Sequence, residues 1–348
     1  MALQDLPLVI QTSYAELLDQ LRLAIASSVP EGSTFRRRTI SGKTYWYIQE
    51  PTTRTGRSPE RYFGADTPEL RSAIEKATAA KSNADGRRAI RRSLVAGGLP
   101  EPDTVTASVI DALALAGVFR LRGIIVGTVA FQTYAGHLGV RLPSAAIRTG
   151  DLDLAQDYGV SVALDDKLDQ PLVEILKTVD PAFVPVPTLA NPLVATTYAR
   201  PGGYRVDVLT TNRGADRDAP VRLPSLQTDA VPLRFLDFLL RDTVEAAVLT
   251  RFGTLVNVPS PERYAVHKMI VSTLRQTTGE SAVKADKDMV QSGILIEALI
   301  LKRRHDDLAD VLREAVQRGA AWKDRLKRSV KRLDDGPRAF VSSVIEDA

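Results

Sequence analysis

The segment from Gly123 to Gln156, GIIVGTVAFQTYAGHLGVRLPSAAIRTGDLDLAQ, constrains the fold more than any other part of the chain. It begins with a short apolar run, GIIVG, which is typical of a strand buried in the middle of a sheet. A helix is predicted next, from near Val129, and a second strand follows that contains Asp151 and Asp153. The order strand, glycine turn, helix, loop, strand predicts a sheet with a helix packed against it.

The glycine turn after the first strand is a candidate phosphate site. Gly127 allows the backbone to turn tightly into the helix. The N–H groups that follow and the Thr128 hydroxyl would then lie at the positive end of the helix dipole, which suits a phosphate group. Gly127 and Thr128 are therefore candidate nucleotide-binding residues. By itself, a Gly-Thr pair after a strand is more often a structural turn.

The second predicted strand carries paired carboxylates. Asp151 and Asp153 are two residues apart, so the alternation of a strand places both on one face and the intervening Leu152 on the other. Their spacing of about 6.6 Å along the strand can bracket two divalent ions about 3.5 to 4 Å apart, as in nucleotidyl transfer. An all-oxygen site completed by water and phosphates suits Mg²⁺, or Mn²⁺ in its place.

A third carboxylate follows in the predicted strand YRVDVLT, where Asp207 shares one face with Arg205 and Leu209. An antiparallel pairing of this strand with residues 151–155 would bring Asp207 to Asp151 and Asp153. Asp207 could then complete a metal site and act as the base that deprotonates an attacking hydroxyl. The three aspartates are the candidate metal ligands and catalytic residues.

The composition supports oxygen ligands over sulfur or nitrogen. The chain has no cysteine, which excludes disulfides, thiolate catalysis and cysteine-based metal centres. Its three histidines are too few for a histidine-rich centre. No apolar run approaches the roughly 20 residues of a membrane-spanning helix, and the N-terminus lacks a basic signal region. The sequence therefore predicts a cytoplasmic protein without a membrane partner.

The basic residues are clustered. The net charge is +4, and positive runs occur at Arg36–Arg38, at Arg87–Arg92 and in the C-terminal stretch KDRLKRSVKR. An anionic partner such as RNA would explain these clusters, but solvated helix faces would explain them equally well. Tyr45, Trp46 and Tyr47 beside the first cluster could stack on bases, although a role in the core of a hairpin is the more common one.

The N-terminal region, residues 1–100, is predicted to be a separate domain. It should contain a helix from Tyr14 to Ser27 with its N-cap at Thr12 or Ser13. A β-hairpin is predicted for FRRRTISGKTYWYIQEP, with Ser41-Gly42-Lys43 at its turn, followed by a helix over 67–93. The run GGLP ends this region near residue 100.

The rest of the chain is divided into a catalytic core, residues 101–225, and a mainly helical C-terminal domain, residues 226–348. The core should open with a helix over about 103–116. In the C-terminal domain, the stretch PLRFLDFLLRDTVEAAVLTRFGTLVNVPSPERYAVHKMIVSTLRQ is predicted to contain a helix, a strand over 254–258 and a second helix opened by PSPE, and several helices should follow from about residue 286.

The ordered set Gly127-Thr128, helix, Asp151-Leu152-Asp153 and Asp207 resembles the pattern of the DNA polymerase β-like nucleotidyltransferase superfamily. The chain most resembles a bacterial family of nucleotidyltransferase-fold proteins and, more distantly, the abortive-infection and toxin-type nucleotidyltransferases. The match spans about residues 120–275, including VNVPSPERYAVHKMIVSTLRQ. It implies an α+β fold with a mixed or antiparallel sheet flanked by helices. It also implies that Lys268 faces a bound triphosphate, although Lys268 and Arg275 could each be a solvated helix residue and His267 is expected to be structural.

This resemblance implies a metal-dependent enzyme that moves a nucleoside monophosphate from a nucleoside triphosphate to a hydroxyl group. RNA, in particular a tRNA end, and protein are both open as acceptors, and a toxin or defence role fits the more distant relatives. The alternative is an inactive module that keeps the fold and binds nucleic acid or a protein partner. Two features differ from the common pattern: threonine at position 128 and a long connection from Gly127 to Asp151.

Overall fold

The computed structural model describes residues 3–25, 34–40, 43–49, 60–143, 146, 150–188, 191–212, 219–275 and 278–348. It has a mixed α and β architecture, as predicted, and within these residues its largest sheet has seven strands. The strand order is β11-β12-β10-β7-β5, with β9 beside β10 and β8 beside β9. The strands are β5 (Ile124–Val126), β7 (Asp151–Gln156), β8 (Val184–Pro187), β9 (Ala195–Ala199), β10 (Arg205–Thr211), β11 (Val221–Leu223) and β12 (Thr228–Leu233).

The direction of β10 corrects one prediction. β10 runs parallel to β7, not antiparallel to it, whereas β5 is antiparallel to β7. Between β7 and β10 the chain passes through α5 (Tyr158–Ala163), α6 (Leu172–Val179) and the β8–β9 pair. A crossover of this length can return the chain to start a parallel strand, whereas a short hairpin cannot.

The apolar run GIIVG forms β5, but this strand lies at an end of the sheet order and not in its middle. It is nevertheless fully buried. The strand β14 (Thr254–Pro259) lies against it, and the Asn257 side chain donates a hydrogen bond of 3.0 Å to the Gly123 carbonyl. The apolar run therefore predicted the burial of this strand correctly but not its position within the sheet.

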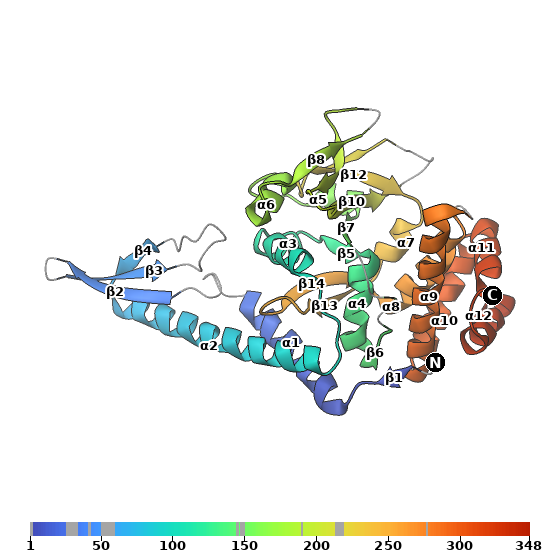
Figure 1. The fold of residues 1–348 in the computed structure, drawn as a ribbon, viewed down its shortest axis with the longest axis horizontal. Coiled ribbons are helices and arrows are strands. Elements are labelled where there is room, and N and C mark those ends of the chain that lie inside the picture. Colours follow the sequence, from blue (N-terminus) through green and yellow to red (C-terminus); the bar gives the residue numbers. More distant parts are fainter. Residues whose placement is uncertain are drawn as a thin grey trace.

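Helices lie on both sides of the central strands (Figure 1). α3 (Thr104–Leu115), which confirms the helix predicted over about 103–116, lies with α6 on one side. On the other side lie α4 (Gly127–Leu138), α8 (Pro261–Ser272) and α9 (Gly279–Leu301). The rings of Tyr134 on α4 and Tyr264 on α8 meet edge to face at 5.3 Å, in the hydrophobic core that joins these helices to the sheet.

The segment TVEAAV forms a strand that the sequence did not predict. This strand, β13 (Thr243–Val248), pairs antiparallel with β14, and the helix predicted before residue 254 is the short α7 (Leu236–Leu240). The predicted strand over 254–258 and the helix opened by PSPE are confirmed, with the Ser260 side chain capping α8. The helical C-terminus is also confirmed, as α9, α10 (His305–Gln317), α11 (Ala320–Val330) and α12 (Asp335–Asp347).

The N-terminal region begins with a short pairing of β1 (Gln4–Asp5) with β6 (Val140–Arg141) and continues into α1 (Leu8–Ile25). This helix starts before the predicted N-cap. The helical turn already begins at Pro7, whose carbonyl accepts from the backbone N–H groups of Ile10 and Gln11. The hydroxyls of Thr12 and Ser13 therefore lie inside the helix and donate to backbone carbonyls one turn earlier. The predicted turn at residues 41–42 and the position of Ser27 lie outside the described residues.

The predicted hairpin is confirmed as β2 (Thr34–Ile40) and β3 (Lys43–Gln49), and β4 (Glu60–Ala65) adds a third strand. The long helix α2 (Pro68–Ala96) follows, capped by Thr67. Figure 1 shows that α2 carries this small sheet away from the rest of the molecule. We refer to the three strands with the first half of α2 as the arm. No helix among the described residues is long and apolar enough to cross a membrane.

Candidate active site

The three aspartates predicted from the sequence, Asp151, Asp153 and Asp207, lie on neighbouring strands. Asp153 is the direct partner of Asp207 in the parallel register of β7 and β10. Directly paired residues project to the same face of a sheet, and so do residues two apart on one strand. All three carboxylates therefore share a face, while Leu152 and Leu154 are fully buried on the other.

Gly127 lies directly against these carboxylates. It has a φ of 65°, which a residue with a side chain rarely adopts, and it is the first residue of α4. A Cβ built at this position would overlap the Asp153 carboxylate. A glycine is therefore needed here both for the turn and for the close approach, and the start of α4, with Thr128, faces the same side of the sheet as the acids.

The Asp153 carboxyl is in an electrostatically unfavourable position. Its pKa is raised from the usual 3.8 to about 6: burial is the largest cause, the nearby Asp151 and Asp207 carboxylates also raise the pKa, and Lys268 and Lys284 act in the opposite direction. The third acid is held by a hydrogen bond of 2.5 Å from the Thr197 hydroxyl on β9 to Asp207 Oδ1. Three acids with this degree of mutual repulsion favour a cation beside them.

The predicted phosphate-facing lysine, Lys268, lies on α8 and forms an ion pair with a carboxylate. Its Nζ donates to Asp288 Oδ1 at 2.6 Å and lies 5.2 Å from the centre of the Tyr264 ring. Arg275 donates from Nε to the other oxygen of Asp288, also at 2.6 Å. Lys268 is therefore close enough to the acids to lower the pKa of Asp153, but its direct partner is Asp288.

Two further lysines near the acids were not singled out from the sequence. Lys284 and Lys287 lie on α9, where Lys284 is close enough to Asp153 to lower its pKa. Burial and Lys268 lower the pKa of Lys287, and the nearby Asp151, Asp288 and Asp153 oppose that shift. The signal in the sequence is KADKD, since residues three and four apart on a helix share a face.

A second layer of contacts fixes the glycine turn. The Tyr264 hydroxyl on α8 is 2.9 Å from the Gly127 carbonyl and 2.9 Å from Gln291 Oε1 on α9. Gln291 Nε2 donates in turn to the Ala146 carbonyl at 2.9 Å. Because these side chains are buried, their hydrogen bonds hold α4, α8 and α9 in a fixed relation around the turn.

The acids and the basic helix residues define what the site can bind. Three carboxylates offer only oxygen ligands, which fits a hard divalent cation such as Mg²⁺. No group of three or more histidine or acidic side chains within the described ranges is already gathered to hold a metal ion. The aspartates are thus aligned by the strands but are not drawn together into a closed cluster.

The other residues considered from the sequence have structural surroundings. Burial lowers the pKa of His267 to about 3, so this side chain is neutral at pH 7. Asp157 is partly buried: it caps α5 and accepts a hydrogen bond from the Thr211 hydroxyl at 2.8 Å. Asp166 is exposed and pairs with Arg120.

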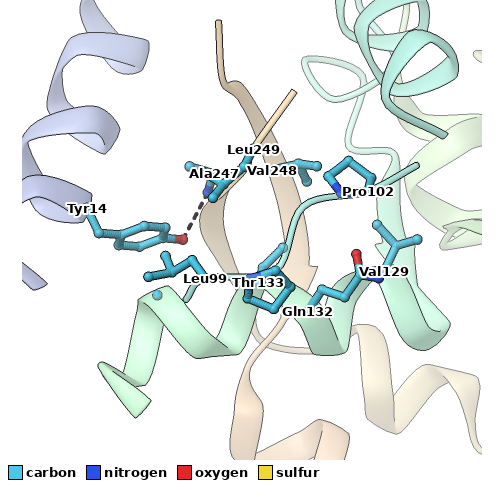
Figure 2. Close-up of a pocket in the computed structure, with 11 residues that line it drawn as sticks. Tyr14, Leu99, Pro102, Val129, Gln132, Thr133, Ala247, Val248 and Leu249 are labelled. Atoms are coloured by element: carbon cyan, nitrogen blue, oxygen red, sulfur yellow. Dashed lines mark hydrogen bonds between the residues drawn. The ribbon is translucent and has the colours of Figure 1, made fainter. Parts of the chain in front are cut away.

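A pocket also lies away from the acids, between α1, α4 and β13 (Figure 2). The Tyr14 hydroxyl closes one side of it and accepts a hydrogen bond of 3.1 Å from the Ala247 backbone N–H. Its lining is largely apolar and includes Leu99, Val129 and Leu249. None of the three aspartates borders it, so we assign it to the packing of α1 on the core.

The raised pKa of Asp153 leads to a testable effect on stability. In EDTA, the free energy of unfolding is expected to fall as pH rises from about 4 to about 6, because the native state must give up a proton that the unfolded carboxyl loses near pH 3.8. A pKa difference of about two units corresponds to a change of about 3 kcal/mol in the free energy of unfolding. We expect about 2 kcal/mol, because Asp153 is partly exposed and solvent screens its charge.

Asp153→Asn should therefore be more stable than the wild type by about 2 kcal/mol at pH 8, with the difference vanishing near pH 4. Denaturant unfolding of both proteins across this pH range measures it. Because both proteins contain the same histidines, their difference isolates Asp153. The control is Asp169→Asn, at an exposed position. Equal stability of the Asp153 variant and the wild type at pH 8 would contradict a raised pKa of Asp153 in the native state.

The mixed sheet carries three acids on one face, beside a glycine turn and a group of lysines. A family model described as nucleotidyltransferase matches residues 104–317, more than half of the chain, and this range contains every candidate site residue. The chain therefore belongs to the nucleotidyltransferase family. No match was found among curated proteins or among solved structures.

Proposed function

We propose that the chain is a metal-dependent enzyme that transfers a nucleoside monophosphate from a nucleoside triphosphate to a hydroxyl group of RNA or protein. Membership of the family supports nucleotidyl transfer in general. The observation that carries the finer proposal is the direct pairing of Asp153 with Asp207 beside the Gly127 turn. A role in toxicity or defence is part of this proposal and depends on the acceptor.

In this proposal the triphosphate lies between the start of α4 and the lysines. The backbone N–H groups after Gly127 and the Thr128 hydroxyl bind phosphate oxygens at the positive end of the helix. Lys268, Lys284 and Lys287 come from α8 and α9 and supply positive charge on the side facing the acids. The positive charge of these lysines would then offset the repulsion between the triphosphate and the aspartates.

The three aspartates would hold Mg²⁺ or Mn²⁺ together with the triphosphate. When bound, such ions neutralise phosphate charge and make an attacking hydroxyl easier to deprotonate. Asp207 is positioned by Thr197 through one carboxylate oxygen and takes up the proton of the acceptor hydroxyl. The acceptor oxygen forms a bond to the α-phosphorus, the bond from that phosphorus to its bridging oxygen breaks, and pyrophosphate leaves.

The proposal is tested by incubating the purified chain with each nucleoside triphosphate, labelled in turn at the α- and the γ-phosphate, in Mg²⁺ or Mn²⁺. Total RNA and lysate protein serve as separate acceptor pools. We expect the α-label, but not the γ-label, to enter one pool with release of pyrophosphate. Entry of the γ-label would indicate phosphoryl transfer instead, and no transfer with any triphosphate would favour an inactive binding module.

A further inference from the structure

The arm has one face that is covered by its own helix. Ile48 on β3 is fully buried, and Gly64 on β4 packs against Leu70 of α2. The Trp46 indole donates to Asp66 Oδ1 at 2.8 Å, and Arg71 on α2 donates to both oxygens of the same carboxylate at 2.8 and 2.7 Å. These contacts fix the sheet to the first half of α2, so only its opposite face can meet a partner.

The opposite face of the arm combines arginines with tyrosines. In the antiparallel register of β2 and β3, Arg36 is the direct partner of Tyr47, and Arg38 is the direct partner of Tyr45, so these four side chains share a face. Both arginines are exposed. The Arg38 guanidinium lies 5.1 Å from the centre of the Tyr47 ring and also pairs with Glu60 at 2.6 Å.

The sequence segment that contains the three arm strands accounts for the net positive charge of the chain. Residues 34–65 contain seven lysines and arginines and two acids, a net charge of +5, whereas all 348 residues together carry +4. The remainder of the chain therefore sums to −1. The same 32 residues hold six of the 20 aromatic residues. A short segment that concentrates both positive charge and aromatic rings is complementary to a phosphate backbone and to the faces of bases.

We propose that the arm face formed by Arg36, Arg38, Tyr45 and Tyr47 binds single-stranded nucleic acid and that RNA is the acceptor strand presented to the active site. Arginines contact phosphates, and aromatic rings or guanidinium planes stack on unpaired bases. The role of that strand as acceptor depends on the proposed function, but binding to the arm does not.

The position of the arm restricts the acceptor to a long molecule. An α-helix rises 1.5 Å per residue, so the 29 residues of α2 span about 43 Å. Figure 1 shows the three strands at the end of α2 that points away from β7 and β10, the strands that carry the aspartates. A mononucleoside or a small metabolite cannot contact both places, whereas a single-stranded RNA can extend from the arm to the site.

The inference is tested by fluorescence anisotropy with labelled single-stranded RNA, single-stranded DNA and duplex DNA at several salt concentrations. For Arg36→Ala/Arg38→Ala we expect the Kd for single-stranded RNA to rise about tenfold, and the log–log salt slope to fall by about 1.4, because two phosphate contacts are lost. The matched control is Lys327→Ala/Lys331→Ala, which removes two exposed positive charges from the basic C-terminal stretch.

Several outcomes would overturn the inference: no binding of RNA by the wild type, preference for duplex DNA, unchanged binding by the arm variant, or an equal loss in the control. Stronger binding of single-stranded DNA than RNA would overturn the choice of RNA as acceptor. Circular dichroism checks that the variants are folded. If the double variant is not folded, the single variant Arg36→Ala is used in its place. Because binding needs no turnover, failure of transfer with intact RNA binding would count against the proposed function alone.

Discussion

Asp153→Asn is expected to lower the rate of nucleotidyl transfer by about a thousandfold or more, with the fold retained. Asparagine has nearly the same shape as aspartate but lacks the negative charge needed to hold a divalent ion beside a triphosphate. Asp151→Asn and Asp207→Asn should have effects of similar size, because in the proposed mechanism the three carboxylates would hold the same ions. Single-turnover transfer of the α-label to the acceptor pool measures the loss.

The control for this series is Asp169→Asn, at an exposed position outside the site. The inactive Asp153 variant should also be the more stable protein in EDTA at neutral pH, so unfolding cannot explain its inactivity. Activity within about tenfold of the wild type in any of the three variants would remove that aspartate from the catalytic assignment.

Gly127→Ala is expected to reduce transfer by about a hundredfold. An added Cβ would displace the Asp153 carboxylate, and a shift of about 1 Å in a reacting group can have an effect of this size. The φ of 65° adds backbone strain of about 1 kcal/mol to any residue with a side chain. Kinetics at saturating triphosphate, together with the free energy of unfolding, separate the two effects.

Gly279 provides a closely matched control for that variant. It has a φ of 66°, it also begins a helix, and a Cβ built there would meet nothing within 4 Å. Gly279→Ala should therefore show a similar loss of stability but nearly normal transfer. If both variants lose activity equally, strain and not the contact with Asp153 explains the effect.

The sequence was sufficient for features that depend on local periodicity. Spacing by two placed Asp151 and Asp153 on one face and predicted a buried Leu152 between them, because the alternation of a strand is a local property. The direction of β10 was not accessible in the same way. It depends on the route of the chain through α5, α6 and the β8–β9 pair, which tertiary packing decides.

Tertiary packing also explains why the strand at TVEAAV and the two lysines were missed. Glu245 and two alanines favour a helix in isolation, but pairing with β14 makes this segment a strand. Lys284 and Lys287 look like ordinary solvated helix residues until α9 is placed beside the aspartates. The sequence showed that the two lysines share a helix face, but it did not show that this face lies beside the aspartates.

The ion pairs of Asp288 have a consequence for the entry of a substrate. This buried carboxylate is shared by Lys268 on one oxygen and Arg275 on the other. An unpaired buried charge is costly, so a buried carboxylate with only one cationic partner would not readily release that partner. In the proposed function, Lys268 would exchange Asp288 for a phosphate, and Arg275 would keep the carboxylate neutralised. Asp288 would then hold the lysine in position between successive turnovers.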